Sequence, residues 1–153
     1  MKRKWMNACF LVCAALLAAG CTGVPRRERD QEQLDRYLRY AGPPVDHVTY
    51  LGHYDNWQSV SPYQLVLWTN INDAYLITVA PPCENLQFAQ RVALTNTAST
   101  ISTHFDAVLV HGWRCMITEI RPIDYLRLRQ DRREERAQQK AEAGQRDEAG
   151  QKP

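Results

Sequence analysis

Histidine is the residue type in this 153-residue sequence that most directly suggests metal binding or proton transfer. A helical zinc site would place two histidines four residues apart, as in a His-Glu-x-x-His motif, and no pair here has that spacing. No metal ligand is therefore assigned from the sequence, and no cofactor is expected. The four histidines are His47, His53, His104 and His111.

Carboxylates could supply hydrolytic chemistry if two of them shared one cleft. The centre of the chain has six, set against three arginines: Asp46, Asp55, Asp73, Glu84, Asp106 and Glu119 against Arg91, Arg114 and Arg121. The sequence contains no Gly-x-Ser-x-Gly elbow, phosphate-binding glycine loop or dinucleotide fingerprint. An enzyme site would have to be assembled by folding alone. A cleft that brings together at least two of His47, His53, Asp55, His104 and His111 would indicate such an enzyme site.

Residues 1–20 have the pattern of an export signal, because Lys2, Arg3 and Lys4 precede an apolar run over residues 8–19. That run is too short to cross a bilayer as a helix, which needs about 20 residues. It ends in Leu-Leu-Ala-Ala-Gly-Cys at residues 16–21, which resembles the lipobox of bacterial lipoproteins. The lipobox usually has leucine where Ala18 stands here. An ordinary signal peptide followed by a cysteine is the alternative.

The lipoprotein resemblance implies that cleavage leaves Cys21 as the first residue, carrying lipid on its thiol and an acyl chain on its amino group. Three acyl chains, at about 0.8 kcal/mol per buried methylene, anchor a protein permanently. Residue 22 is threonine, not the aspartate that retains enteric lipoproteins in the inner membrane. The resemblance therefore implies an outer-membrane protein that faces the periplasm.

Two of the five cysteines remain for the folded part, Cys83 and Cys115, once Cys9 and Cys13 leave with the signal and Cys21 carries lipid. In an oxidising compartment an even pair favours a structural disulfide. It would close a loop of about 33 residues, which the chain-entropy model values at roughly 3.5–4 kcal/mol. A redox-active pair and two free buried thiols are the alternatives, and the Cys-x-x-Cys spacing of redox sites is absent.

Composition indicates one modest domain, with 44% hydrophobic and 24% charged residues. The net charge is +2, and it becomes −1 without residues 1–20, since 16 basic residues then face 17 acidic ones. A nearly neutral chain offers no basic surface for nucleic acid, so we expect no nucleic-acid partner.

The sequence predicts an α+β fold: a small antiparallel sheet of five or six strands that can curl toward a barrel, an N-terminal helix and a charged C-terminal helix. Leu34, Tyr37, Leu38 and Ala41 form the apolar stripe of the first helix, which Gly42 and two prolines end. The strongest strands are 64–69 with 74–80 and 107–111 with 115–120, each pair joined by a short turn. Weaker expectations are strands at 48–51 and 92–94, a loop or edge strand at 95–103, and a short helix at 84–91.

Four segments follow from these patterns: a signal peptide at 1–20, a polar tether at 21–33, one folded domain at 34–128, and a charged tail at 129–153 that is helical or disordered. The tail has no large apolar residue, so we expect a solvated helix that frays through Gly144 and Gly150. A docking arm is its functional alternative. Five aromatics near predicted turns could line a ligand groove, but core filling is favoured in so small a domain: Tyr50, Tyr54, Trp57, Tyr63 and Trp113.

Two stretches carry a family resemblance. Tyr-Leu-Arg-Tyr-Ala-Gly occupies residues 37–42, and Cys-Met-Ile-Thr-Glu-Ile-Arg-Pro-Ile-Asp occupies residues 115–124. Over residues 34–128 the chain resembles domain-of-unknown-function family 6491, a family of Gram-negative envelope proteins. The resemblance implies envelope localisation and paired cysteines, and it lends no catalytic residue. Within the second stretch, Glu119 and Arg121 share one side of a strand, where we expect a structural ion pair.

The expected function is that of a lipid-anchored, periplasm-facing envelope protein. A non-enzymatic binding or structural module is the preferred interpretation, with another envelope protein or the cell wall as its partner. The alternative is a periplasmic hydrolase or metal-dependent enzyme with a site built from histidine and aspartate residues.

Overall fold

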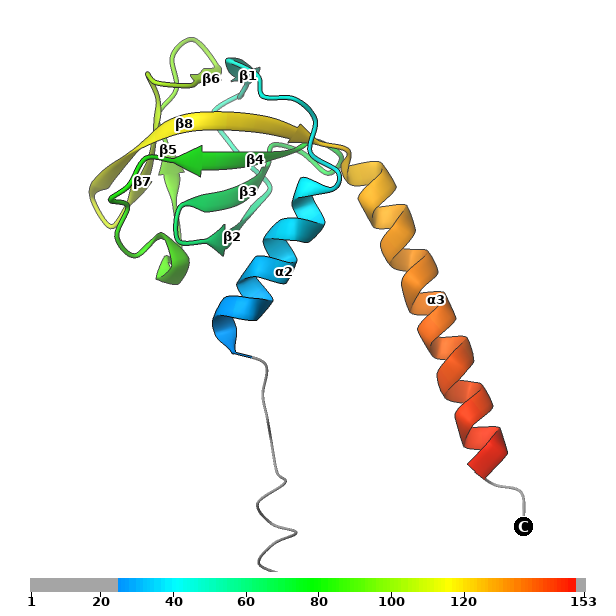
Figure 1. Cartoon of the computed structure of the whole chain (residues 1–153). Helices are drawn as coiled ribbons and strands as arrows, with labels where there is room; N and C mark the ends of the chain where they lie inside the picture. The colour runs from blue at the N-terminus through cyan, green and yellow to red at the C-terminus, as the bar shows by residue number, and fades with distance from the viewer. Residues whose placement is uncertain (1–24, 151–153) are drawn as a thin grey trace, which may run out of the picture.

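The computed structural model describes residues 25–150 (Figure 1). The expected signal peptide, the lipidation site Cys21 and the first residues of the tether lie outside the described residues. In residues 25–150 no helix combines the length and the apolar character that crossing a membrane requires.

Six strands form one antiparallel sheet, the main sheet, which bends into a half-barrel (Figure 1). Its order is β2 (Asn56–Ser61), β3 (Gln64–Trp68), β4 (Ala74–Val79), β8 (Trp113–Ile123), β7 (Ala107–Val110) and β5 (Ala93–Leu94). A two-stranded sheet pairs β1 (His47–Thr49) with β6 (Thr100–Ser102). Together with helices α2 (Arg26–Leu38) and α3 (Tyr125–Gly150), this confirms the predicted α+β class with its N-terminal and C-terminal helices.

The main sheet is covered on both faces, and successive residues of β3 therefore enter two different cores. Leu65 and Leu67 point into the larger core, which lies between the main sheet and the β1–β6 pair. Val66 and Trp68 point into the smaller core, where α2 and the start of α3 cover the sheet. Because both faces are buried, β3 is a continuous apolar run, which is why the sequence predicts it well.

Helix α2 begins at Arg26, so residues 26–33, expected as tether, are helical. Arginine, glutamate and glutamine favour helix by propensity even where no apolar stripe marks it. A hydrogen bond also holds this part of α2 to the domain, since the Gln87 amide donates to Asp30 over 2.5 Å.

The sequence does not predict β2, because this edge strand is mostly polar and only Val60 is fully buried. It predicts the ends of other elements imperfectly. Strand β8 continues beyond residue 120 to Ile123, through Pro122. The expected short helix at 84–91 is a 3₁₀ turn, η1 (Leu86–Phe88), and the stretch 95–103 contains β6.

Cys83 and Cys115 form the predicted disulfide, with their Cα atoms 5.4 Å apart. Cys115 lies on β8, and Cys83 lies in the loop that follows β4. Both cysteines belong to the larger core, as does Leu86 of η1. The bond therefore ties the loop that carries η1 to the main sheet.

Replacing both cysteines with alanine should lower the free energy of unfolding by about 3–4 kcal/mol, because the unfolded chain regains the entropy of an open loop. Urea denaturation followed by circular dichroism measures the loss. The reduced wild-type protein should unfold at the same urea concentration as the double variant. Equal stability of the variant and the oxidised wild type would contradict a stabilising disulfide.

Helix α3 continues through Gly144 to Gly150 instead of fraying at the glycine. Up to residue 146, where the description of side chains ends, only the first turns of α3 pack on the domain. Leu128 is buried, the Tyr40 hydroxyl donates to Asp131 over 2.5 Å, and the Arg132 guanidinium lies 5.7 Å from the centre of the Tyr37 ring. All residues from 133 to 146 are exposed. Contacts with the domain thus reach Arg132, slightly beyond the expected boundary at residue 128.

A chain that ends after Ala137 should keep the unfolding free energy of the full chain. A chain that ends after Arg129 should lose about 1–3 kcal/mol, because it lacks the Tyr40–Asp131 hydrogen bond and the Arg132–Tyr37 contact. Thermal melts of the three proteins provide the comparison. Loss of cooperative unfolding in the chain that ends after Ala137 would show that the exposed part of α3 is required for folding.

Candidate functional site

The four histidines are exposed and lie on different parts of the domain. His47 begins β1, His53 follows in the loop before β2, His104 lies in the turn before β7, and His111 lies in the β7–β8 turn. In the part of the chain that the structure describes, no three His, Cys, Asp or Glu side chains lie close enough to hold a metal ion. His53 and Asp55 line different clefts, so the convergence that would mark an assembled enzyme site is not seen among these residues.

Two of the histidines have a conformational role. The φ angles of His104 and His111 are 67° and 48°, in the left-handed region that most residue types avoid. Histidine, like asparagine, is found there more often than most other non-glycine residues. Their positions in tight turns therefore explain these histidines without any ligand.

The carboxylates near the middle of the chain have structural partners. Asp106 is 3% exposed, and it accepts hydrogen bonds from the Thr95 hydroxyl over 2.9 Å and from the Ser102 amide over 2.8 Å. It thereby fixes β6 beside the start of β7. Glu119 accepts a hydrogen bond from Arg121, which confirms the expected ion pair on β8.

A small cleft, the His53 cleft, opens on one side of the turn between β3 and β4. Its volume is about 230 Å³, and it is lined by Thr49, Leu51, His53, Thr69, Asn70, Asp73 and Tyr75. The Asp73 carboxylate accepts a hydrogen bond from the Asn70 amide over 2.5 Å. Burial, with a smaller effect of Asp73, raises the pKa of the Tyr75 hydroxyl above its ordinary value. Since no hydrogen bond joins His53 to another described side chain, the cleft contains no paired base and nucleophile.

A second cleft, the Trp68 cleft, lies on the other side of the same turn. It measures about 340 Å³ and is lined by Asp55, Asn56, Trp68, Asn70, Ile71, Tyr125 and Arg129. The Trp68 ring meets Tyr125 edge-on at 5.6 Å, and the Arg129 guanidinium lies 5.8 Å from the centre of the Tyr125 ring. These contacts hold Arg129 at the mouth of the cleft by a cation–π interaction.

A third cleft, the arginine cleft, continues from Arg129 along α3. It measures about 490 Å³ and is lined by Asn72, Leu126, Arg129, Gln130 and Arg133. Leu126, which lines this cleft, is 59% exposed, and Ile71, which lines the adjoining Trp68 cleft, is 69% exposed. We call the surface formed by Asn70, Ile71, Asn72, Leu126, Arg129 and Arg133 the turn surface. Exposed apolar groups beside arginines are suited to binding another macromolecule rather than to proton transfer.

The sequence did not identify the turn surface as a site. Ile71 stands among polar turn residues and Leu126 begins a charged helix, so each departs from its surroundings, but no motif links them. Core filling by the aromatics is confirmed for Tyr50, Tyr54 and Trp57, which pack in or against the larger core. It is wrong for Tyr63 and Trp113, which are 42% and 63% exposed.

Comparison with known proteins identifies a family. No curated protein and no solved structure matches the chain. The model of a family of unknown function, DUF6491, matches residues 1–139, a span that includes the whole β-sheet and the part of α3 that lines the arginine cleft. The chain therefore belongs to the family of unknown function DUF6491.

Proposed function

We propose that this protein is a lipid-anchored envelope protein that faces the periplasm and works there as a non-enzymatic binding module. The turn surface is the observation that carries the proposal. Ile71 and Leu126 are both more than half exposed. Ile71 shares the Trp68 cleft with Arg129, and Leu126 shares the arginine cleft with Arg129 and Arg133. An apolar pair next to arginines is the composition typical of the centre of a protein interface.

Two features support export and anchoring. Residues 1–21 combine a basic start, a short apolar run and a cysteine preceded by small residues. The Cys83–Cys115 disulfide supports an oxidising compartment, because disulfides form and persist outside the reducing cytosol. The residue after Cys21 is threonine, which favours the outer membrane.

The enzymatic alternative depends on the His53 cleft. That cleft brings His53 and Asp73 together, but the Asp73 carboxylate is already bonded to Asn70. A hydrolase or metal-dependent enzyme would need a second base, nucleophile or metal ligand aligned with His53. The turn surface needs no further group, so binding is the preferred function.

Lipidation of Cys21 can be tested by feeding cells labelled palmitate. The wild-type protein should carry the label and fractionate with the outer membrane, because its thiol and amino group are acylated. Cys21→Ser should lose the label and appear in the soluble periplasmic fraction or as uncleaved precursor. Equal labelling of this variant would contradict the anchor.

The binding role can be tested by size-exclusion chromatography of the protein extracted in mild detergent. We expect the wild type in a complex larger than the detergent-bound monomer. Ile71→Asp combined with Leu126→Asp should shift it to the monomer position, because two charges then occupy the apolar part of the turn surface.

Leu51→Asp is the matched control, since Leu51 is 71% exposed but lines the His53 cleft on the other side of the turn. It should leave the complex intact. Thermal melts confirm that each variant is folded. A wild-type protein that migrates as a monomer would contradict the binding module.

A further inference from the structure

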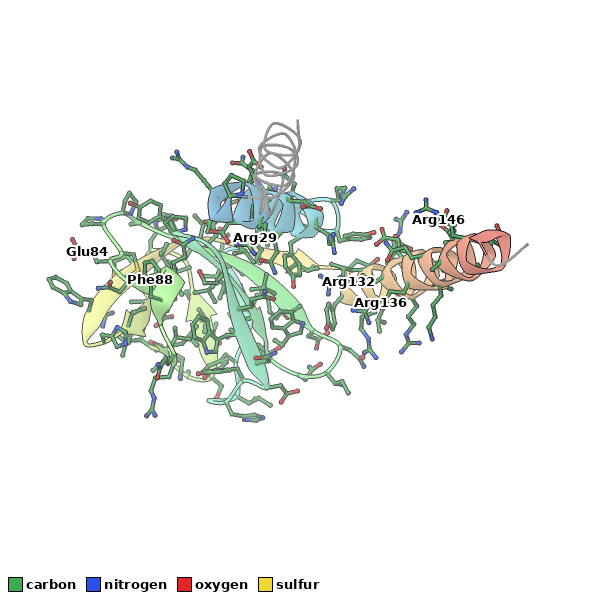
Figure 2. All side chains as sticks on the ribbon, turned by 90° about the horizontal axis from the view of Figure 1, so that it is seen from below. Arg29, Glu84, Phe88, Arg132, Arg136 and Arg146 are labelled. Carbon is green, nitrogen blue, oxygen red and sulfur yellow. A yellow bond between two sulfur atoms is a disulfide. The ribbon has the colours of Figure 1, made fainter. Side chains whose placement is uncertain are left out.

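The charged side chains of α3 are sorted onto different faces of the helix. At 3.6 residues per turn, Arg129, Arg133, Arg136 and Lys140 fall within an arc of about 60°. We call these four residues the cationic stripe. Asp131, Glu135 and Glu142 fall on the opposite face. Figure 2 labels Arg132, Arg136 and Arg146 along this helix.

The cations of the stripe have no acidic partner among the described residues. The two ion pairs found there join Glu32 to Arg36 and Glu119 to Arg121, both away from α3. An ordinary solvated helix is stabilised by placing opposite charges four residues apart. Here Arg129 and Arg133 are four residues apart, as are Arg136 and Lys140, so the spacing brings like charges together. Each such pair costs about 0.2–0.5 kcal/mol of helix stability.

The stripe is continuous with the turn surface. Arg129 and Arg133 line the arginine cleft together with Leu126, which forms the apolar end of the same helix face. From there the stripe extends to Lys140, about 16 Å along the helix. One surface thus presents apolar groups at the base of α3 and positive charge along its exposed part.

We propose that this combined surface binds an acidic helical segment of a partner protein, with an apolar side chain of the partner seated between Ile71 and Leu126. The proposal rests on the binding role proposed above and names the chemistry of the partner. Charge complementarity carries it, because four unpaired cations at three- to four-residue intervals match carboxylates spaced along one helix face. Contact with them would offset the cost of the like-charge pairs.

A second copy of the chain fits this surface less well. The cationic and acidic faces of α3 point in opposite directions. If the cationic face of one copy paired with the acidic face of a second copy, the first copy would keep its acidic face unpaired and the second would keep its cationic face unpaired. Such a contact is heterologous and builds open chains instead of a closed dimer.

A lipid surface also fits less well. Beyond Leu128 the helix has no large apolar side chain to insert among lipids. From Tyr125 to Gly150 it contains seven basic and six acidic residues, so a flat anionic surface would gain little net attraction.

Site-specific photocrosslinking in cells that make the full-length protein tests the proposal. The photoreactive residue p-benzoylphenylalanine replaces Gln130, which lines the arginine cleft with Arg129 and Arg133 at the edge of the stripe, or Gln138, which lies on the face of α3 opposite the stripe. We expect an adduct at Gln130 whose partner peptide, sequenced by mass spectrometry, is rich in aspartate and glutamate. The yield at Gln138 should be lower by about fivefold or more.

Charge reversal provides the second arm. Arg136→Glu should reduce the Gln130 adduct by about fivefold, because one attraction becomes a repulsion. Arg146→Glu makes the same change of charge outside the cationic stripe, about 15 Å further along the same helix, and should leave the yield within about twofold. Arg136→Lys should retain most of the adduct.

Four results would overturn the proposal: no adduct at Gln130, an adduct with the chain's own peptides, an adduct with phospholipid, or a protein adduct that Arg136→Glu leaves unchanged. A large complex on size-exclusion chromatography together with any of these would leave the binding role standing and reject this inference alone. A monomer on the column with no adduct would reject both.

Discussion

The pairing of β8 with its neighbours fixes the position of nearly every feature described above. Its second half pairs with β4, from Ala74 opposite Ile123 to Val79 opposite Ile117, and its first half pairs with β7. The second half of β8 is also bonded along the edge that faces away from β4. There, the backbone amides of Gly42 and Val45 donate hydrogen bonds to the carbonyl oxygens of Pro122 and Ile120. One strand thus joins the half-barrel to the segment that follows α2. A shift of one residue in this register would exchange the two cores, because alternate residues face opposite sides.

The same register creates the turn surface. Because Ala74 is opposite Ile123, the turn before β4 lies where β8 ends and α3 begins. Asp124 then starts the helix, since its carboxylate accepts a hydrogen bond from the Arg127 amide over 3.1 Å, as an N-cap does. For this reason Ile71 and Leu126, which are far apart in the sequence, line two adjoining clefts that share Arg129.

This dependence on register explains what the sequence could predict. Apolar runs predict β3, β4 and β7, because this signal is local. The Cys83–Cys115 bond is predicted from the even number of cysteines that remains once residues 1–21 are set aside as an expected lipoprotein signal. The polar strand β2 and the early turns of α2 carry no such signal. The positive φ angles of His104 and His111 are also invisible in the sequence, because histidine adopts this conformation only where the turn requires it. The turn surface needed the pairing of β4 with β8, which no short motif encodes.

The first turns of helix α3 stabilise its attachment to the domain, and its later turns are exposed and available for contact with a partner. Its first two turns are held by the Asp124 cap, by Leu128 in the smaller core, by the hydrogen bond from Tyr40 to Asp131, and by the cation–π contact of Arg132 with Tyr37. Burial and an N-cap stabilise a helix by about a kcal/mol or more each, which outweighs the cost of a few like-charge pairs. The anchored base therefore allows the exposed turns to carry a charge arrangement that an isolated helix would disfavour. The same base sets the direction of the cationic stripe, so that the stripe begins beside Ile71 and Leu126 and forms one surface with them.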